Sequence, residues 1–311
     1  MLNLTEEKKI TGIITPLVTP LHADGTLDNE GLGNVVNHVI EGGVKGIFVL
    51  GTTGEGPSLT YALRRAVIQE TCELVNGRIP VLVGITDSSL GESIELANYS
   101  KQVGADAVVS APPFYYYLSQ QELFQYFKVF AEQSPLPLFL YNMPGQTKLT
   151  IDVSTITQLA DYPNVFGIKD SSANAIYYNT LIERLKEKSG FSIFVGPDEM
   201  MASTVLAGGD GGVNSGSNLF PKLYVALFEA CQKGDTDRVA QLQSLVIQVS
   251  LGIYSGVKSE NSFLKGLKSA LQAKGICSNH HALPLLRHTD SEYELIENNC
   301  LDLDGKIGQV V

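Results

Sequence analysis

PVLVGITDSSLGESIELANYSKQVGADAVVSA, residues 80–111, contains two short apolar runs with an amphipathic stretch between them. The runs PVLVGI and DAVVSA are rich in valine and too short for typical helices, so they indicate strands. Residues 93–104 have helical periodicity and end in glycine, as many helices do. The stretch therefore predicts a strand–helix–strand unit whose two strands are parallel.

The same pattern recurs along the chain. Eight apolar runs occupy residues 12–18, 45–51, 80–85, 106–111, 136–142, 165–170, 191–196 and 211–216. They are almost continuously hydrophobic, as expected for parallel strands that are buried on both faces. Eight such units predict a (β/α)8 TIM barrel. The main alternative is a doubly wound open sheet, but its glycine fingerprint is missing after the first run, where the chain reads TPLHADG.

The character of the chain changes after the eighth run. Residues 222–300 contain helical stretches without intervening strands. We therefore expect a barrel over residues 10–221 and a C-terminal helical region over residues 222–300 that packs on it. The polar residues after about Asp302 are expected to fray at the chain end.

Composition excludes several classes of function. The chain has 311 residues, 44% of them hydrophobic, a mean hydropathy of +0.07 and a net charge of −11. This charge disfavours nucleic acid and anionic membranes as partners. No apolar run reaches the ~20 residues of a membrane span, and the N-terminal MLNLTEEKKI lacks the apolar segment of a signal peptide. We expect a cytoplasmic protein.

The four cysteines are Cys72, Cys231, Cys277 and Cys300. They are isolated in sequence and form no CxxC motif, so we interpret them as reduced, mostly packing thiols. Two histidines follow Cys277 closely, but no second ligand cluster accompanies them. We therefore predict no metal site.

Active sites of TIM barrels lie at the C-terminal ends of the strands. The sixth run, NVFGIKDSS at residues 164–172, ends in Lys169. Burial disfavours a charged ammonium, and a neutral amine can attack a carbonyl to form a Schiff base. The residues alone also allow a lysine that pairs with a carboxylate or reaches solvent.

Tyr141 ends the preceding run and could relay protons beside such an amine. A buried tyrosine that hydrogen-bonds a backbone group is the alternative. The second run ends in GTTGEG, residues 51–56, which offers the hydroxyls of Thr52 and Thr53 and several backbone N–H groups. A turn of this kind that enters a helix suits a small carboxylate, although it could also be a simple turn and helix cap. Phosphate is disfavoured because the loop carries Glu55 and no cation.

Taken together, GTTGEG, PPFYYY, YNMPG, GIKDSS and GPDE occur in an order that resembles the dihydrodipicolinate synthase / N-acetylneuraminate lyase family of class I aldolases. The resemblance covers about residues 10–290. It implies that a 2-oxo acid such as pyruvate forms a Schiff base with Lys169 and that Tyr141 relays protons. It also implies that Gly51, Thr52 and Thr53 hold the carboxylate. No added cofactor is expected, because the lysine supplies the carbonyl chemistry.

The family resemblance also implies a homotetramer, with a dimer as the alternative. In such an assembly Tyr115, from PPFYYY, would complete the proton relay of a neighbouring subunit. Gly196, Val213 and Ser215, at the ends of the seventh and eighth runs, are further candidate substrate contacts.

Two features bear on the second half of the substrate. Family members that make the lysine precursor carry an arginine five residues after the tyrosine, whereas this chain has Gln146. Asp198 and Glu199, in GPDE, resemble the acidic pair with which neuraminate lyases bind sugar hydroxyls, although acids also suit the start of a helix.

These features favour an aldolase that cleaves or condenses a hydroxylated, sugar-acid-like substrate such as N-acetylneuraminate or a 2-keto-3-deoxy sugar acid. A 2-keto-3-deoxy acid dehydratase and 4-hydroxy-tetrahydrodipicolinate synthase are the alternatives of the same chemistry. A non-catalytic ligand-binding barrel and a phosphate-binding barrel enzyme are alternatives of other classes.

Overall fold

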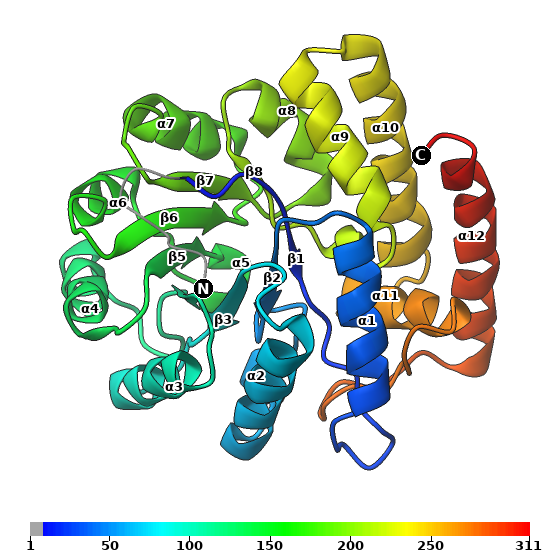
Figure 1. Cartoon of the computed structure of the whole chain (residues 1–311), viewed down its shortest axis with the longest axis horizontal. Helices are drawn as coiled ribbons and strands as arrows, with labels where there is room; N and C mark the ends of the chain where they lie inside the picture. Colours follow the sequence, from blue (N-terminus) through cyan, green and yellow to red (C-terminus); the bar gives the residue numbers. More distant parts are fainter. Residues whose placement is uncertain (1–8) are drawn as a thin grey trace.

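Eight parallel strands form a closed barrel in the order in which they occur along the chain (Figure 1). The structure, a computed structural model, describes residues 9–311. The expectation that MLNLTEEKKI is not a signal peptide therefore falls mostly outside the described residues. The strands are β1 (Gly12–Pro16), β2 (Gly46–Val49), β3 (Val81–Gly84), β4 (Ala107–Ser110), β5 (Leu138–Asn142), β6 (Val165–Asp170), β7 (Ser192–Val195) and β8 (Gly211–Gly212). Each lies within a predicted run. Because β8 pairs with β1, the barrel is confirmed and the open sheet is wrong.

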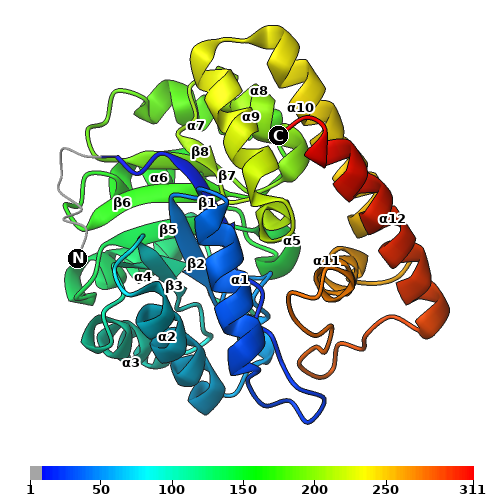
Figure 2. The same cartoon turned by 45° about the vertical axis from the view of Figure 1, so that its right-hand side comes forward.

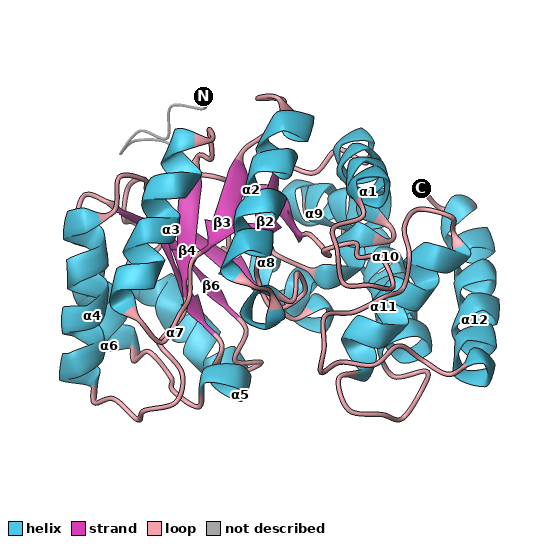
Figure 3. Ribbon diagram, turned by 90° about the horizontal axis from the view of Figure 1, so that it is seen from below, coloured by secondary structure: helices cyan, strands magenta, loops and turns pink. Residues whose placement is uncertain are grey.

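Helices surround the barrel (Figure 3). They are α1 (Asn29–Glu41), α2 (Tyr61–Val75), α3 (Leu90–Gln102), α4 (Gln120–Gln133), α5 (Pro144–Thr147), α6 (Val153–Leu159), α7 (Ala175–Leu185), α8 (Met201–Leu206), α9 (Pro221–Lys233), α10 (Thr236–Val249), α11 (Ser262–Ala273) and α12 (Asp290–Gly308). Local sequence sets several ends. Ser89 caps α3, Ser119 and Glu122 form a capping box at α4, and Gly234 ends α9 in the left-handed conformation.

Two apolar layers hold the barrel together. The inner layer fills the barrel and includes Phe48, Phe139 and Phe194, whereas the outer layer packs the strands against the helices. Apolar residues on both faces explain why the strands appear as continuous hydrophobic runs. In β6, Ile168 belongs to the outer layer, so the next side chain, Lys169, points into the barrel.

The seam of the barrel depends on glycine. Gly211 of β8 pairs with Gly12 of β1 and has a φ of +148°. A Cβ atom at Gly211 would lie 1.9 Å from the Gly12 carbonyl oxygen, which no side chain can tolerate. The close approach of β8 to β1 therefore requires this residue to be glycine.

The C-terminal helices gather on one side of the barrel, as Figures 1 and 2 show for α10, α11 and α12. A π-helical turn, Ser250–Tyr254, follows α10. The expectation of a frayed end after Asp302 is wrong, because α12 continues to Gly308 and buries Leu303 and Ile307. The first helix of the predicted C-terminal region, α9, packs against β1 and completes the outer ring of the barrel.

Candidate active site

Lys169 and Tyr141 lie side by side on neighbouring strands. The register of β5 and β6 pairs these two residues directly. The Lys169 Nζ atom lies 4.5 Å from the centre of the Tyr141 ring and 5.3 Å from that of Phe48. Lys169 is only 7% exposed, and no carboxylate among residues 9–311 lies within ion-pair distance of it. The structure thus presents a buried primary amine without a counter-ion beside a phenol.

The next residue of β6 has a different function. The Asp170 side chain accepts hydrogen bonds from the Asn142 amide and from Ser172. Burial nevertheless raises the pKa of Asp170. Because Asn142 also accepts a hydrogen bond from the Ile151 N–H, these contacts fix the ends of β5 and β6 from outside the barrel. They hold the two strands in the register that brings Tyr141 to Lys169.

The Tyr141 hydroxyl is shared with the turn that follows β2. It lies 3.2 Å from the Thr52 hydroxyl. The Thr53 hydroxyl lies 2.8 Å from that of Ser215, in the segment after β8. No acceptor within residues 9–311 takes the backbone N–H of Thr52 or Thr53. The turn therefore combines hydroxyls with unpaired N–H groups, which is the chemistry that binds an anion.

The prediction that GTTGEG leads straight into a helix needs correction. A short 3-10 turn, Gly56–Ser58, follows it, and α2 begins only at Tyr61 with Thr60 as its cap. An anion at this turn would therefore meet the N–H groups of the turn itself rather than the end of α2.

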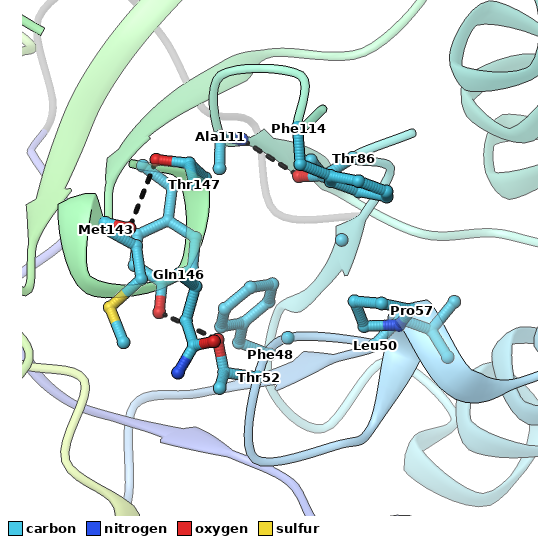
Figure 4. Close-up of a pocket in the computed structure, with 13 residues that line it drawn as sticks. Phe48, Leu50, Thr52, Pro57, Thr86, Ala111, Phe114, Met143, Gln146 and Thr147 are labelled. Carbon is cyan, nitrogen blue, oxygen red and sulfur yellow. Dashed lines mark hydrogen bonds between the residues drawn. The ribbon is translucent and has the colours of Figure 1, made fainter. Parts of the chain in front are cut away.

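A cavity of about 260 Å³ opens above the turn (Figure 4). Its lining consists of Phe48, Leu50, Gly51, Thr52, Pro57, Gly84, Thr86, Ala111, Phe114, Tyr141, Met143, Gln146 and Thr147. Lys169 is not in this lining, but its amine lies over the rings of Phe48 and Tyr141, which are. No cation lines the cavity, so its polar character comes from hydroxyls and the Gln146 amide.

Four predicted residues, Gly51, Thr52, Tyr141 and Gln146, line this cavity, whereas sequence reasoning missed Thr86, Ala111 and Met143. Thr86 and Ala111 follow β3 and β4, and the Thr86 hydroxyl accepts the Ala111 N–H. Applying the strand-end rule to these two strands as well would have found both residues.

The other predicted contacts lie elsewhere. Val213 lines the barrel interior beneath the site, next to Lys169. Ser215 contacts Thr53 through its hydroxyl, and the carbonyl of Gly196 accepts a hydrogen bond from the Asn214 amide. Ser215 thus contacts the Thr52–Thr53 turn through its hydroxyl and does not line the cavity.

Asp198 is committed to the protein itself. It is 4% exposed, and its carboxylate accepts hydrogen bonds from the hydroxyls of Tyr224 and Tyr254 and from the N–H groups of Ser215 and Gly216. Burial raises the pKa of Asp198, although these donors oppose the rise. Its expected contact with sugar hydroxyls therefore has no support in the structure.

Glu199, the other acid of the pair, is exposed and accepts a hydrogen bond from the Ser250 hydroxyl. Ser250 and Tyr254 both belong to the π-helical turn. The π-helical turn thus hydrogen-bonds the segment after β7. Asp198, within that segment, hydrogen-bonds the backbone after β8.

Replacing Asp198 by alanine is expected to lower the free energy of unfolding by about 3 kcal/mol, because four buried donors lose their acceptor. The Tyr254→Phe variant removes one donor only and should cost about 1 kcal/mol. Urea unfolding of both variants measures the difference. A fully stable Asp198→Ala variant with only a raised KM would contradict the assignment.

The tyrosines of PPFYYY point to solvent. Tyr115, Tyr116 and Tyr117 are 85%, 75% and 81% exposed, and Tyr115 has a φ of +96°. Only Phe114 of this stretch reaches the cavity lining. Within one chain, Tyr115 is therefore not part of the group around Lys169.

The four cysteines form no disulfides, and burial raises the pKa of Cys72 and Cys277 to about 12 and that of Cys300 to about 11. Across residues 9–311, no group of three or more His, Cys, Asp or Glu side chains is placed to hold a metal ion. In the same part of the chain, none of the helices combines the length and hydropathy of a membrane span.

The chain resembles known proteins over nearly its whole length. The model of the Dihydrodipicolinate synthetase family matches residues 9–300. A probable 2-dehydro-3-deoxy-D-pentonate aldolase of Escherichia coli (strain K12) is 34% identical over 92% of this chain and 94% of its own.

Solved structures agree with this match. A dihydrodipicolinate synthase from Bacteroides thetaiotaomicron has a TM-score of 0.92 and 47% identity over 94% of this chain and 98% of its own. The prophage protein YagE of Escherichia coli K12, in complex with pyruvate, has a TM-score of 0.89 and 30% identity over 94% and 98%. The chain therefore belongs to the dihydrodipicolinate synthetase family and is an enzyme of the aldolase type.

Proposed function

We propose that the chain is a lyase that binds a 2-oxo acid as a Schiff base on Lys169 and cleaves a carbon–carbon bond of a hydroxylated sugar acid. The observation that carries the proposal is the buried, unpaired amine of Lys169 beside Tyr141, whose hydroxyl lies 3.2 Å from that of Thr52. The amine supplies the nucleophile, Tyr141 the proton relay, and the Gly51–Thr53 turn the carboxylate contacts.

The reaction balances without an added cofactor. The Lys169 amine attacks C2 of the 2-oxo acid and water leaves, which gives a protonated imine. The C3–C4 bond then breaks. Its electron pair enters the imine to form an enamine, and the C4 hydroxyl passes its proton to the relay through Tyr141. Protonation of C3 and hydrolysis of the imine release pyruvate and restore the amine.

The cavity supports a short substrate that carries one carboxylate. Its volume of about 260 Å³ is at the small end for a ligand site, and no cation lines it to bind a second carboxylate. The Gln146 amide can donate to and accept from a sugar hydroxyl. With Asp198 committed elsewhere, we favour a 2-keto-3-deoxy sugar acid over the larger N-acetylneuraminate. The Escherichia coli relative, a probable 2-dehydro-3-deoxy-D-pentonate aldolase, is consistent with this choice.

Two other reactions use the same imine. Loss of a hydroxyl instead of an aldehyde would make the enzyme a 2-keto-3-deoxy acid dehydratase. Condensation with aspartate semialdehyde would make it a 4-hydroxy-tetrahydrodipicolinate synthase, and the Bacteroides thetaiotaomicron relative carries a name of that kind. Assays of 2-keto-3-deoxy sugar acids and N-acetylneuraminate, coupled to pyruvate detection, separate cleavage from dehydration. Formation of a product lighter than the substrate by one water, without pyruvate, would assign the dehydratase reaction.

We also propose that the exposed tyrosines pack against a second copy of the chain, as the family resemblance implies. Three large aromatic side chains lie in the solvent next to Phe114, which lines the cavity. In that assembly Tyr115 would serve the site of the neighbouring copy.

The shared chemistry is tested by borohydride reduction in the presence of pyruvate, followed by mass spectrometry of the peptides. The expected product is a Lys169 side chain heavier by pyruvate less one oxygen atom. If the folded enzyme carries no such adduct, the proposed mechanism fails.

Gln146 tests the choice of the second substrate. We expect little synthase activity with aspartate semialdehyde, because nothing in the lining pairs with its carboxylate. The Gln146→Arg variant adds a bidentate donor and should raise kcat/KM for this substrate about tenfold or more. Steady-state kinetics of both proteins measures the change. Robust synthase activity in the unaltered enzyme would contradict the importance that we give to Gln146.

A further inference from the structure

Glu55 of the GTTGEG turn forms a buried ion pair that the proposed chemistry does not use. Its Oε1 atom lies 2.6 Å from the Lys268 Nζ atom, and both side chains are fully enclosed. Lys268 belongs to α11 and also donates to the carbonyl of His280. The N–H of Ala282 donates to Glu55 Oε2 at 2.8 Å, and the His281 ring lies 3.3 Å from Oε1. Glu55 thus joins the turn to the C-terminal region.

The electrostatics fit an ionised Glu55. Burial alone would raise its pKa, but the His281 hydrogen bond and the Lys268 charge together hold the pKa below the ordinary value. Burial lowers the pKa of His281, so that ring is neutral at ordinary pH. Glu55 and Lys268 therefore neutralise each other inside the protein, away from the cavity lining.

The backbone of Glu55 closes the turn that carries Thr52 and Thr53. The Glu55 N–H donates to the Thr52 carbonyl at 3.1 Å, and the Glu55 carbonyl accepts from the Ser58 N–H at 2.8 Å. Glu55 has a φ of +55°, a conformation that a residue with a side chain adopts only when its surroundings impose it. Gly56 then packs so tightly on Leu50 that a Cβ atom would lie 2.1 Å from the Leu50 carbonyl oxygen.

A buried ion pair is poor evidence of stabilisation, because apolar residues of similar size often serve the fold equally well. Unlike apolar side chains, however, the ion pair fixes the relative position of its two partners. Here that geometry holds Glu55 in the left-handed conformation, two positions after Thr53. The Thr53 backbone N–H has no acceptor within residues 9–311.

We propose that Glu55 is a positioning residue, which Lys268 of α11 anchors so that the Thr52–Thr53 turn keeps the shape that receives the substrate carboxylate. This inference rests on the proposed function for the identity of the ligand, but not for the effect on the turn. It makes the C-terminal region part of the substrate-binding apparatus, although the cavity lining contains no residue of that region.

The test compares three variants of the full chain. Glu55→Gln combined with Lys268→Met removes both charges at similar side-chain size. Glu55→Asp keeps the charge but shortens its reach. Lys274→Met is the control, because Lys274, the residue after α11, forms its ion pair with Asp304 of α12 and not with the turn.

Hydrogen exchange of the Glu55 and Gly56 N–H groups, which donate to the carbonyls of Thr52 and Gly51, measures the integrity of the turn without ligand. We expect exchange to become about tenfold faster in the double variant and to stay unchanged in Lys274→Met. Unchanged exchange in a folded double variant would overturn the proposal. If the double variant does not fold, the same exchange measurement on Glu55→Asp decides, and unchanged exchange there would overturn the proposal. Failure of both variants to fold would show that the ion pair stabilises the whole chain rather than the turn, which would also overturn the proposal.

Borohydride trapping with pyruvate gives the functional readout. The pyruvate concentration that half-saturates trapping should rise about tenfold in the double variant, while the trapped amount at saturation stays near that of the unaltered enzyme. No trapping in the unaltered enzyme refutes the proposed function alone, since the exchange measurement still tests the turn. Normal trapping with an unchanged half-saturating concentration in the folded double variant refutes the positioning role.

Discussion

Alanine in place of Lys169 is expected to lower turnover by at least about 10³-fold and to abolish the borohydride adduct with pyruvate. The loss follows because, among residues 9–311, Lys169 supplies the one amine that lies over the Phe48 and Tyr141 rings that line the cavity. Removal of a buried amine that lacks a counter-ion should leave the barrel folded. Circular dichroism checks the fold, and a coupled pyruvate assay measures the turnover.

The control for this variant is Lys188→Ala. Lys188 forms an ion pair with Asp161. It precedes β7, so it lies at the N-terminal end of the barrel strands, opposite the site. This variant should turn over substrate and form the adduct like the unaltered enzyme. Substantial turnover by Lys169→Ala would rule out imine catalysis at this residue.

Phenylalanine in place of Tyr141 is expected to lower kcat about 10²-fold, the usual contribution of a positioned proton donor and acceptor. The ring that lies 4.5 Å from the Lys169 amine remains, and only the hydroxyl shared with Thr52 is lost. The pyruvate adduct should therefore still form, but more slowly. Rapid-quench trapping with borohydride measures its rate separately from turnover.

Tyr99→Phe is the matched control, because Tyr99 donates its hydroxyl to Gln69 on the outer helices. It should change neither rate. If Tyr141→Phe turns over substrate at the normal rate, the proton passes through another group, and the Thr52 hydroxyl would be the next to replace.

The sequence was sufficient to predict the barrel and the proximity of Lys169 to Tyr141. Strands that are buried on both faces leave an unambiguous pattern, and the barrel then brings the ends of successive strands together. Lys169 and Tyr141 could be paired because each ends a strand and the two strands are consecutive. The register that aligns them was not readable, because it depends on contacts such as those between Asn142 and Asp170.

The interpretation of Asp198 failed for a physical reason. Two neighbouring acids after a strand are suitable acceptors for sugar hydroxyls if they face the cavity. The donors that occupy Asp198 come from Tyr224 and Tyr254, which are 26 and 56 positions further along the chain. No local pattern links a tyrosine in a helix to a carboxylate at such a distance. The cavity residues Thr86 and Ala111 follow β3 and β4, and they were missed because the strand-end rule was not extended to these two strands.

The buried contact between Glu55 and Lys268 joins residues 213 positions apart. During synthesis the turn after β2 emerges early, but the lysine that anchors it emerges only after the entire barrel. All eight strands can thus be synthesised while the turn after β2 still lacks the lysine that pairs with Glu55. If Glu55 positions the turn as we propose, a chain that ends before α11 would contain all eight strands but lack the anchor of this turn.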